Sequence, residues 1–178
     1  MKKKLIERVT VGSGGAASIT FSDIPATYTD LYLLVSIRES RTDVGSAGGV
    51  SWTLRFNGVT TNQSQRDLRY NPSGSTPSTS ADSLFYMLSC TGYDTANTFS
   101  SGGITIPNYA GSTNKSFSAE NLGENNGNSG GRMSGGLWSS TDAITSISLH
   151  PSTGTFVEFS SASLYGIVRG SDGTTTVS

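Results

Sequence analysis

Apolar residues recur at every second position in several short, separate runs of this sequence. The two clearest runs cover residues 31–37 and 52–56, where leucine, valine, isoleucine, tryptophan and phenylalanine alternate with other residues. Shorter runs of the same kind cover residues 9–11, 19–21, 84–88, 104–106, 147–149, 157–159 and 164–167. Side chains of an extended strand point alternately to its two faces, so each run predicts a strand with one buried face.

Turn-forming residues separate these runs. Glycine, proline and asparagine cluster at residues 12–15, 57–58, 71–74, 107–111 and 151–154, where they supply the backbone angles that chain reversals need. We expect the cluster at 12–15 to form a hairpin turn. Eight or more short strands follow, and the fold class is all-β, an antiparallel two-sheet β-sandwich. We favour a jelly roll, although periodicity does not separate it from other Greek-key sandwiches.

The chain has the length of one domain. Its 178 residues suffice for a single core that buries roughly two-thirds of the unfolded surface. We assign residues 1–8 to an N-terminal arm, 9–169 to the β-sandwich and 170–178 to a flexible or extended C-terminal tail. Residues 62–81 and 123–136 are polar and rich in turn formers, which predicts two long loops at the ends of the sandwich.

The charge pattern argues against several classes of protein. A formal net charge of −1 gives no basic field for binding nucleic acid. Lys2, Lys3 and Lys4 are not followed by the apolar run of a signal peptide or membrane span, so we expect synthesis in a reducing cytoplasm and no membrane partner. The single cysteine, Cys90, lies in an apolar segment and is predicted to be a buried thiol.

No arrangement of residues suggests catalysis or a cofactor. The only histidine is His150, so no site with two histidines exists in one chain, and Cys90 lies where a thiolate is disfavoured. Glu120 and Glu124 are the best pair for glycoside hydrolysis, but they adjoin a predicted loop and lack the aromatic surroundings of a sugar cleft. We therefore predict that the protein is not an enzyme and uses neither metal nor cofactor.

Four aromatic residues lie beside predicted loops: Tyr70, Tyr93, Tyr109 and Trp138. Aromatic rings at such positions either stack on sugar rings or bury their area at the edge of the core, and burial is the commoner outcome. The residues that we select as exposed or ligand-contacting candidates are Tyr70, Tyr93, Asn125 and Asn126.

Three blocks of sequence resemble a β-sandwich module common in virion proteins of tailed bacteriophages. They are TVGSGGAASITF at residues 10–21 with its continuation to residue 31, IPNYAGSTNKS at 106–116, and GLWSSTDAITSI at 136–147, which leads to the last strand at 164–167. Together they span most of the chain. These are scaffold motifs, so they transfer no catalytic residue.

The resemblance implies a jelly-roll-like subunit, often trimeric, found in tail fibres and in small capsid-attached proteins. Only about eight residues precede the first predicted strand, which favours a decoration (cement) protein that binds the major capsid protein on the outer surface of the virion. Lys2, Lys3 and Lys4 are then the candidate capsid contact, with residues 123–136 facing outward. The alternative is a receptor-binding tail-fibre tip that recognises a host surface glycan.

Overall fold

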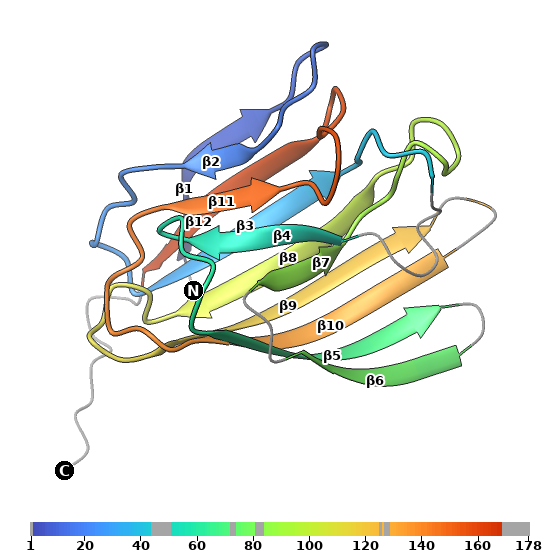
Figure 1. The fold of residues 1–178 in the computed structure, drawn as a ribbon. Helices are drawn as coiled ribbons and strands as arrows, with labels where there is room; N and C mark the ends of the chain where they lie inside the picture. The colour runs from blue at the N-terminus through green and yellow to red at the C-terminus, as the bar shows by residue number, and fades with distance from the viewer. Residues whose placement is uncertain are drawn as a thin grey trace.

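Two antiparallel sheets lie face to face in the computed structural model, which describes residues 2–43, 51–71, 74–80, 84–124, 126 and 129–168 (Figure 1). This part of the chain forms twelve strands: β1 (Lys2–Thr10), β2 (Ile19–Phe21), β3 (Asp30–Ile37), β4 (Ser51–Phe56), β5 (Gln63–Asn71), β6 (Gly74–Ser80), β7 (Phe85–Leu88), β8 (Ser100–Pro107), β9 (Lys115–Glu124), β10 (Ser129–Trp138), β11 (Ile147–His150) and β12 (Ser161–Val168). The larger sheet has the order β1-β12-β3-β8-β9-β10-β5-β6 and the smaller one β2-β11-β4-β7. The all-β sandwich predicted from the sequence is confirmed.

Eight of these strands have the connectivity of a jelly roll. Four of them, β1-β12-β3-β8, lie side by side in the larger sheet, and the other four, β2-β11-β4-β7, make up the smaller sheet. When only these eight strands are followed in chain order, each lies in the other sheet from the one before it, except that β4 and β7 are paired neighbours in the smaller sheet. This alternation distinguishes a jelly roll from a simple meander. The remaining strands, β5–β6 and β9–β10, extend the larger sheet beyond β8.

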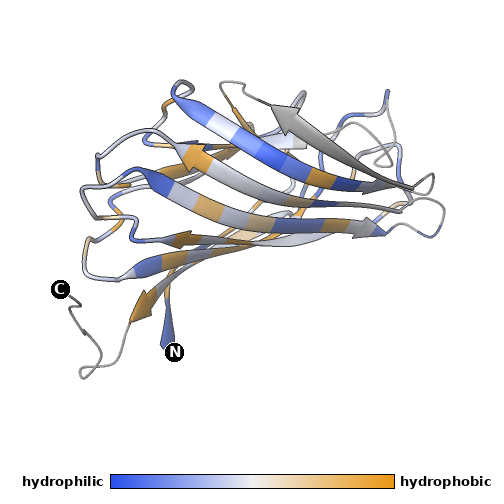
Figure 2. Cartoon of the chain, turned by 90° about the horizontal axis from the view of Figure 1, so that it is seen from below, coloured by the Kyte–Doolittle hydropathy of each residue, from blue (hydrophilic) through white to orange (hydrophobic). Residues whose placement is uncertain are grey.

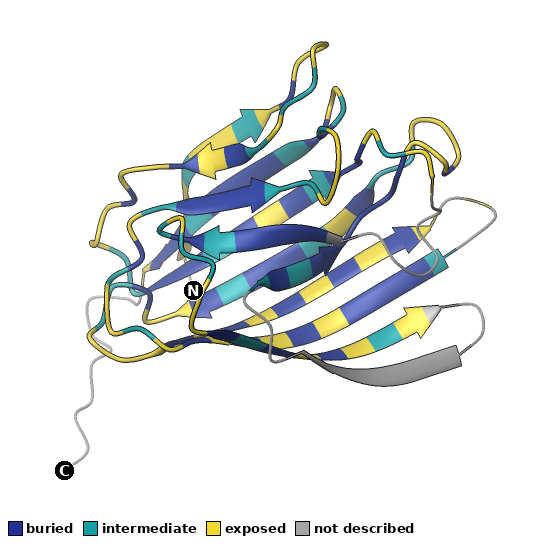
Figure 3. Ribbon diagram, in the orientation of Figure 1, coloured by how far each residue is buried: buried dark blue, intermediate teal, exposed yellow. Residues whose placement is uncertain are grey.

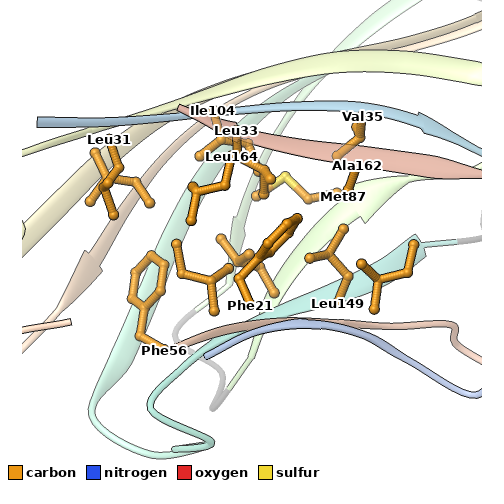
Figure 4. Packing of buried hydrophobic residues seen from close by; sticks show 14 of the residues in the cluster. Phe21, Leu31, Leu33, Val35, Phe56, Met87, Ile104, Leu149, Ala162 and Leu164 are labelled. Carbon is orange, nitrogen blue, oxygen red and sulfur yellow. The ribbon is translucent and has the colours of Figure 1, made fainter. Parts of the chain in front are cut away.

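The core lies between the two sheets. Alternate residues of β3 are buried completely, as are the apolar residues of β4 and β11, and Figure 4 shows side chains from both sheets meeting in one cluster. Phe56 and Phe85 of the smaller sheet contact Phe117 of the larger one, with ring centroids 6.0 and 4.6 Å apart. These edge-to-face contacts attach the added strand β9 to the jelly-roll core.

The prediction of two long loops, at residues 62–81 and 123–136, is wrong. Residues 62–81 contain the whole of the β5–β6 pair, and residues 123–136 contain the end of β9 and most of β10. Both segments pair in continuous register with neighbouring strands, β5 with β10 and β10 with β9. Main-chain hydrogen bonds of a ladder do not depend on side-chain type, so polar residues suffice once a partner strand is present.

The predicted N-terminal arm is also wrong, because residues 2–8 belong to β1 and pair with β12 across the register Lys2 to Val168. A β-bulge between Leu5 and Glu7 interrupts that register. Residues 157–159, predicted as a strand, form a turn closed by a 3.1 Å hydrogen bond from Ser160 N to Val157 O. The predicted tail at residues 170–178 lies outside the described residues.

Of the turns predicted at residues 57–58 and 12–15, the first is confirmed and the second differs in the strands that it joins. Asn57 and Gly58 have φ values of 51° and 69°, the pair of positive angles typical of a type I′ turn, and Val59 N donates to Phe56 O at 2.9 Å. That turn is confirmed. The cluster at 12–15 is a turn, with Gly15 N donating to Gly12 O at 3.0 Å, but it joins β1 of one sheet to β2 of the other. It is therefore not the hairpin turn that we expected.

Candidate functional site

The larger sheet has an outer face that no other described element covers, and it carries large apolar side chains. They are Leu34 on β3, Leu122 on β9, Met133 and Leu137 on β10, and Leu68 and Tyr70 on β5, with between 37% and 62% of each residue exposed. We call this set the outer surface. Figure 2 shows apolar residues interrupting the hydrophilic strands of the larger sheet. Adjoining apolar side chains of this kind mark binding surfaces on soluble proteins.

The outer surface exists because β5 and β10 reverse the usual orientation of polar and apolar residues. On β5, Gln65 and Asp67 point inward and are buried, while Leu68 points outward. On β10, Arg132 and Ser134 are buried while Met133 is exposed. Because the side-chain period of a strand is two residues, the paired register that turns these polar residues inward turns the apolar ones to solvent.

The outer surface is continuous across neighbouring strands. The register aligns Glu120 of β9 with Met133 of β10 and Met133 with Leu68 of β5. In the adjacent row Leu122 and Tyr70 flank Gly131, and a Cβ on Gly131 would lie 2.7 Å from Leu122 Cδ2. A glycine at this position lets the leucine lie flat against the sheet.

Two shallow hollows lie on the outer surface where glycine leaves space. One surrounds Gly103 and is lined by Tyr32, Thr105, Ser118, Glu120 and Met133, with Leu34 and Leu122 on its other side. The other surrounds Gly135 and is lined by Ser64, Arg66, Ser116 and Leu137. Both hollows are open to solvent and mix polar with apolar groups, which suits contact with an extended partner rather than enclosure of a small molecule.

Lys3 joins the N-terminal strand to the outer surface. Its Nζ lies 3.5 Å from the ring centroid of Tyr32, whose own ring is 6.4 Å from that of Tyr165. A cation over an aromatic face is a favourable contact. The ammonium group is thereby held at the β1 edge of this face, beside the hollow that Tyr32 lines.

The structure does not bring the predicted contact residues together. Lys2, Lys3 and Lys4 are exposed on β1, while Tyr70 is half-exposed on β5, six strand spacings or about 29 Å away. Tyr93 is 68% exposed in the connection between β7 and β8.

Of the two asparagines selected with them, Asn126 lies between β9 and β10. Asn126 is exposed there with a φ of 65°, and its N–H donates to Glu124 Oε1 at 2.7 Å. Asn125 lies outside the described residues.

Two of the four aromatic residues considered for sugar stacking are in the core. Tyr109 is fully buried, its hydroxyl donates to Pro25 O, and burial raises its pKa. Trp138 is 2% exposed, with its ring 5.9 Å from that of Phe56. Neither ring is available to a ligand.

The predicted buried thiol is confirmed. Cys90 is fully buried, and desolvation followed by the charge of Asp94 raises its pKa to about 11. Burial and then the charge of Arg55 lower the pKa of His150, whose Nε2 lies 3.0 Å from Ser148 Oγ. In the part of the chain that the structure describes, no hydrogen bond joins Cys90 to His150.

Glu120 and Glu124 do not face one another. Both are exposed on the same side of β9, four residues apart, which places their Cα atoms roughly 13 Å apart. A retaining or inverting glycosidase holds its two carboxyl groups about 5–10 Å apart across the sugar. Among the described residues, no three potential metal ligands cluster together, and no helix is long and apolar enough to span a bilayer.

The outer surface is the most extensive candidate site on the described part of the chain. The chain matches no protein-family model, no curated protein and no solved structure.

Sequence reasoning missed Leu34, Leu68, Leu122 and Met133, although one signal was present. Leu68 and Tyr70 alternate with charged Arg69 and Asp67, which predicts a strand with one apolar face. That run is surrounded by glycine, serine and proline, which are typical of loops, so the sequence predicts a loop over residues 62–81. The pattern also does not reveal that the apolar face is the exposed one.

Proposed function

We propose that this protein is a non-catalytic structural subunit of a tailed-bacteriophage particle, a decoration (cement) protein that binds the outside of the major capsid lattice. The observation that carries the proposal is the outer surface, a broad sheet face with adjoining exposed apolar side chains and shallow hollows. The jelly-roll connectivity agrees with the resemblance of the sequence to virion modules.

The size of the larger sheet fits this role. Eight strands have seven spacings of about 4.8 Å, and strands of about eight residues are roughly 27 Å long, so the face covers roughly 900 Å². A stable protein–protein interface buries about 800 Å² on each partner. Binding across neighbouring capsid subunits would resist their separation, because a ligand that binds only the assembled state stabilises that state.

The edge of the sheet is less suited to binding. Strand β1 carries Lys2, Lys3 and Lys4 and a bulge after Leu5, features that discourage addition of a further strand. We therefore assign the capsid contact to the outer surface, with the basic β1 edge next to an acidic rim on the partner.

The experiment that tests the proposal locates the protein on intact particles by electron microscopy with a gold-labelled antibody. We expect label spread over the head and binding of the purified protein to empty capsids. Particles without label would contradict assignment to the virion. Mass measurement in solution tests the trimer that the resemblance implies.

A second candidate is a receptor-binding tail-fibre tip. Tyr70 and the hollow beside Tyr32 favour it, because exposed rings next to polar groups suit stacking on a sugar. In that case label would be confined to the tail, and the purified protein would bind host cells and be displaced by their surface glycan.

A further inference from the structure

The inner face of the larger sheet contains a cluster of charged groups near the edge of the sandwich. Arg132 of β10 is paired in register with Arg69 of β5, and Asp67 lies two residues before Arg69 on the same face. Only 6% of Arg132 and 7% of Asp67 is exposed. Strands β5 and β6 extend the larger sheet beyond β7, the last strand of the smaller sheet (Figure 1), so this cluster lies where the described strands of the smaller sheet end.

Asp67 is the only carboxylate that the described residues contribute to the cluster, and its two oxygens are shared among several donors. Its Oδ1 accepts hydrogen bonds from Gln65 Nε2 at 2.6 Å and Ser134 Oγ at 2.8 Å. Its Oδ2 lies 3.4 Å from Arg69 Nη2 and 3.8 Å from Arg132 Nε. The distance to Arg132 is too long for a hydrogen bond.

Three buried guanidinium nitrogens in this cluster have no hydrogen-bond partner among the described residues. They are Nε and Nη1 of Arg132 and Nε of Arg69. Two positive charges thus face one negative charge, and burial, followed by the charge of Arg69, lowers the pKa of Arg132 to about 10. A buried charge without full compensation is strongly unfavourable.

Two other buried cations of the described residues are satisfied locally, whereas half-buried Arg55 has a single unpartnered nitrogen, Nε. Arg38 is as buried as Arg132, yet its Nη1 and Nη2 donate to the main-chain oxygens of Asp94, Thr95 and Thr98 at 2.8 to 2.9 Å. Lys115 is 1% exposed, and its Nζ donates to Gly111 O at 2.7 Å. Among the described residues, Arg132 is the cation with two buried, unpartnered nitrogens.

We propose that Arg132 and Arg69 form a binding site for a small oxyanion, a carboxylate, sulfate or phosphate group, at the edge of the sandwich between β5 and β7. Guanidinium groups are suited to such ligands, because their N–H donors are fixed in a plane and oxyanions present several acceptor oxygens. The side chain of Arg69 is 40% exposed and provides the approach from solvent. The bound anion supplies the second negative charge and accepts from the unpartnered nitrogens.

The test is thermal unfolding of the full chain in sodium sulfate, phosphate or acetate, compared with sodium chloride at equal ionic strength. We expect a saturable rise in the unfolding midpoint with at least one oxyanion, as for any ligand that binds only the folded state. A larger effect of acetate identifies a carboxylate site, and a larger effect of sulfate or phosphate identifies a tetrahedral-anion site.

Two variants distinguish this site from a general salt effect. Arg132→Met is expected to lose the saturable rise. Arg66→Met removes an arginine from the exposed side of β5, the strand that carries Arg69, and is expected to keep the saturable rise. An equal rise in both variants, or a rise that never saturates, would overturn the proposal.

A direct measurement covers the case in which Arg132→Met fails to fold. The side-chain Nε–H resonance of Arg132 in the unmodified protein is expected to shift with added oxyanion and to reach a plateau at the concentration where the unfolding midpoint does. A resonance that stays unchanged throughout the titration would refute the site.

Discussion

At the scale of single residues, two buried titratable groups, Glu39 and Cys90, lie in one region of the protein. Glu39 is fully buried, and its Oε2 accepts hydrogen bonds from Ser152 N at 3.2 Å and Ser152 Oγ at 2.8 Å, while its Oε1 has no partner. Cys90 lies in the same region, since Glu39 N donates to Cys90 O at 2.8 Å. Burial raises the pKa of both groups, so each binds its proton more tightly in the folded protein than in the unfolded chain.

The first prediction concerns the reactivity of Cys90. A rise in its pKa from 9.0 to about 11 lowers the thiolate fraction at pH 8 about a hundredfold. We expect a disulfide reagent such as DTNB to label the folded protein at least a hundred times more slowly than the protein in denaturant. Similar rates in the two states would contradict the buried, protonated thiol.

The second prediction concerns the pH dependence of stability. Burial raises the pKa of Glu39 above its ordinary value of 4.5, so the folded state binds the proton more tightly than the unfolded chain does. The free energy of unfolding therefore falls as the pH rises from 4.5 through the raised pKa of the folded state. Glu39→Gln removes this ionisation and retains an oxygen acceptor for Ser152. We expect the unfolding midpoint of the variant, relative to the unmodified protein, to increase between about pH 4 and pH 7.

The comparison between the two proteins also provides the control for the second prediction. The pKa of Asp43 is lowered by its hydrogen bond to Arg41, so its effect on stability has the opposite sign. Because Asp43 is present in both proteins, its contribution cancels in the difference. A difference that does not change with pH would show that Glu39 is not the responsible group.

At the scale of strands, several side chains of the larger sheet lie across a glycine of the neighbouring strand. Phe117 of β9 covers Gly136 of β10, where an added Cβ would lie 2.0 Å from the ring. Tyr32 of β3 covers Gly103 of β8 in the same way on the outer face. Such pairs compensate for the weak strand propensity of glycine, and they shape both the core and the hollows of the outer surface.

The third prediction compares two adjacent glycines of β10. Gly136→Ala forces Phe117 to move within the core, and we expect a loss of about 1–3 kcal/mol in the free energy of unfolding. Gly135→Ala points to the exposed face, where a Cβ meets nothing within 4 Å, so we expect a change between about zero and a 1 kcal/mol gain. Urea denaturation of both variants measures the difference, and equal losses would contradict the packing of Phe117.

At the scale of the whole molecule, the jelly roll is widened on one side. Strands β5, β6, β9 and β10 double the width of the larger sheet and leave the smaller sheet at four strands (Figure 3). The outer face of this wide sheet points away from the core, so its side chains are available to contact a partner. The proposed capsid contact and the proposed anion site lie on opposite sides of these added strands.

The fourth prediction tests the outer surface as the contact. Met133→Glu places a charge among Leu68 and Leu122, and we expect at least a tenfold weaker affinity for empty capsids, or about 1.4 kcal/mol, with an unchanged unfolding midpoint. Phe159→Glu is the matched control, because Phe159 is 67% exposed in the turn at residues 157–160, away from this face. Equal binding by both variants would exclude the outer surface.

The sequence by itself determined the two-sheet sandwich and the core faces of residues 31–37 and 52–56. Regular alternation reports burial directly, since one side of each strand must leave water. Only the tertiary structure decided that residues 62–81 and 123–136 form strands and which of their faces is inward. The reason is physical: their ladders rest on main-chain hydrogen bonds to neighbouring strands, and Asp67, Arg132 and Ser134 are buried by the register of those strands rather than by their own hydrophobicity.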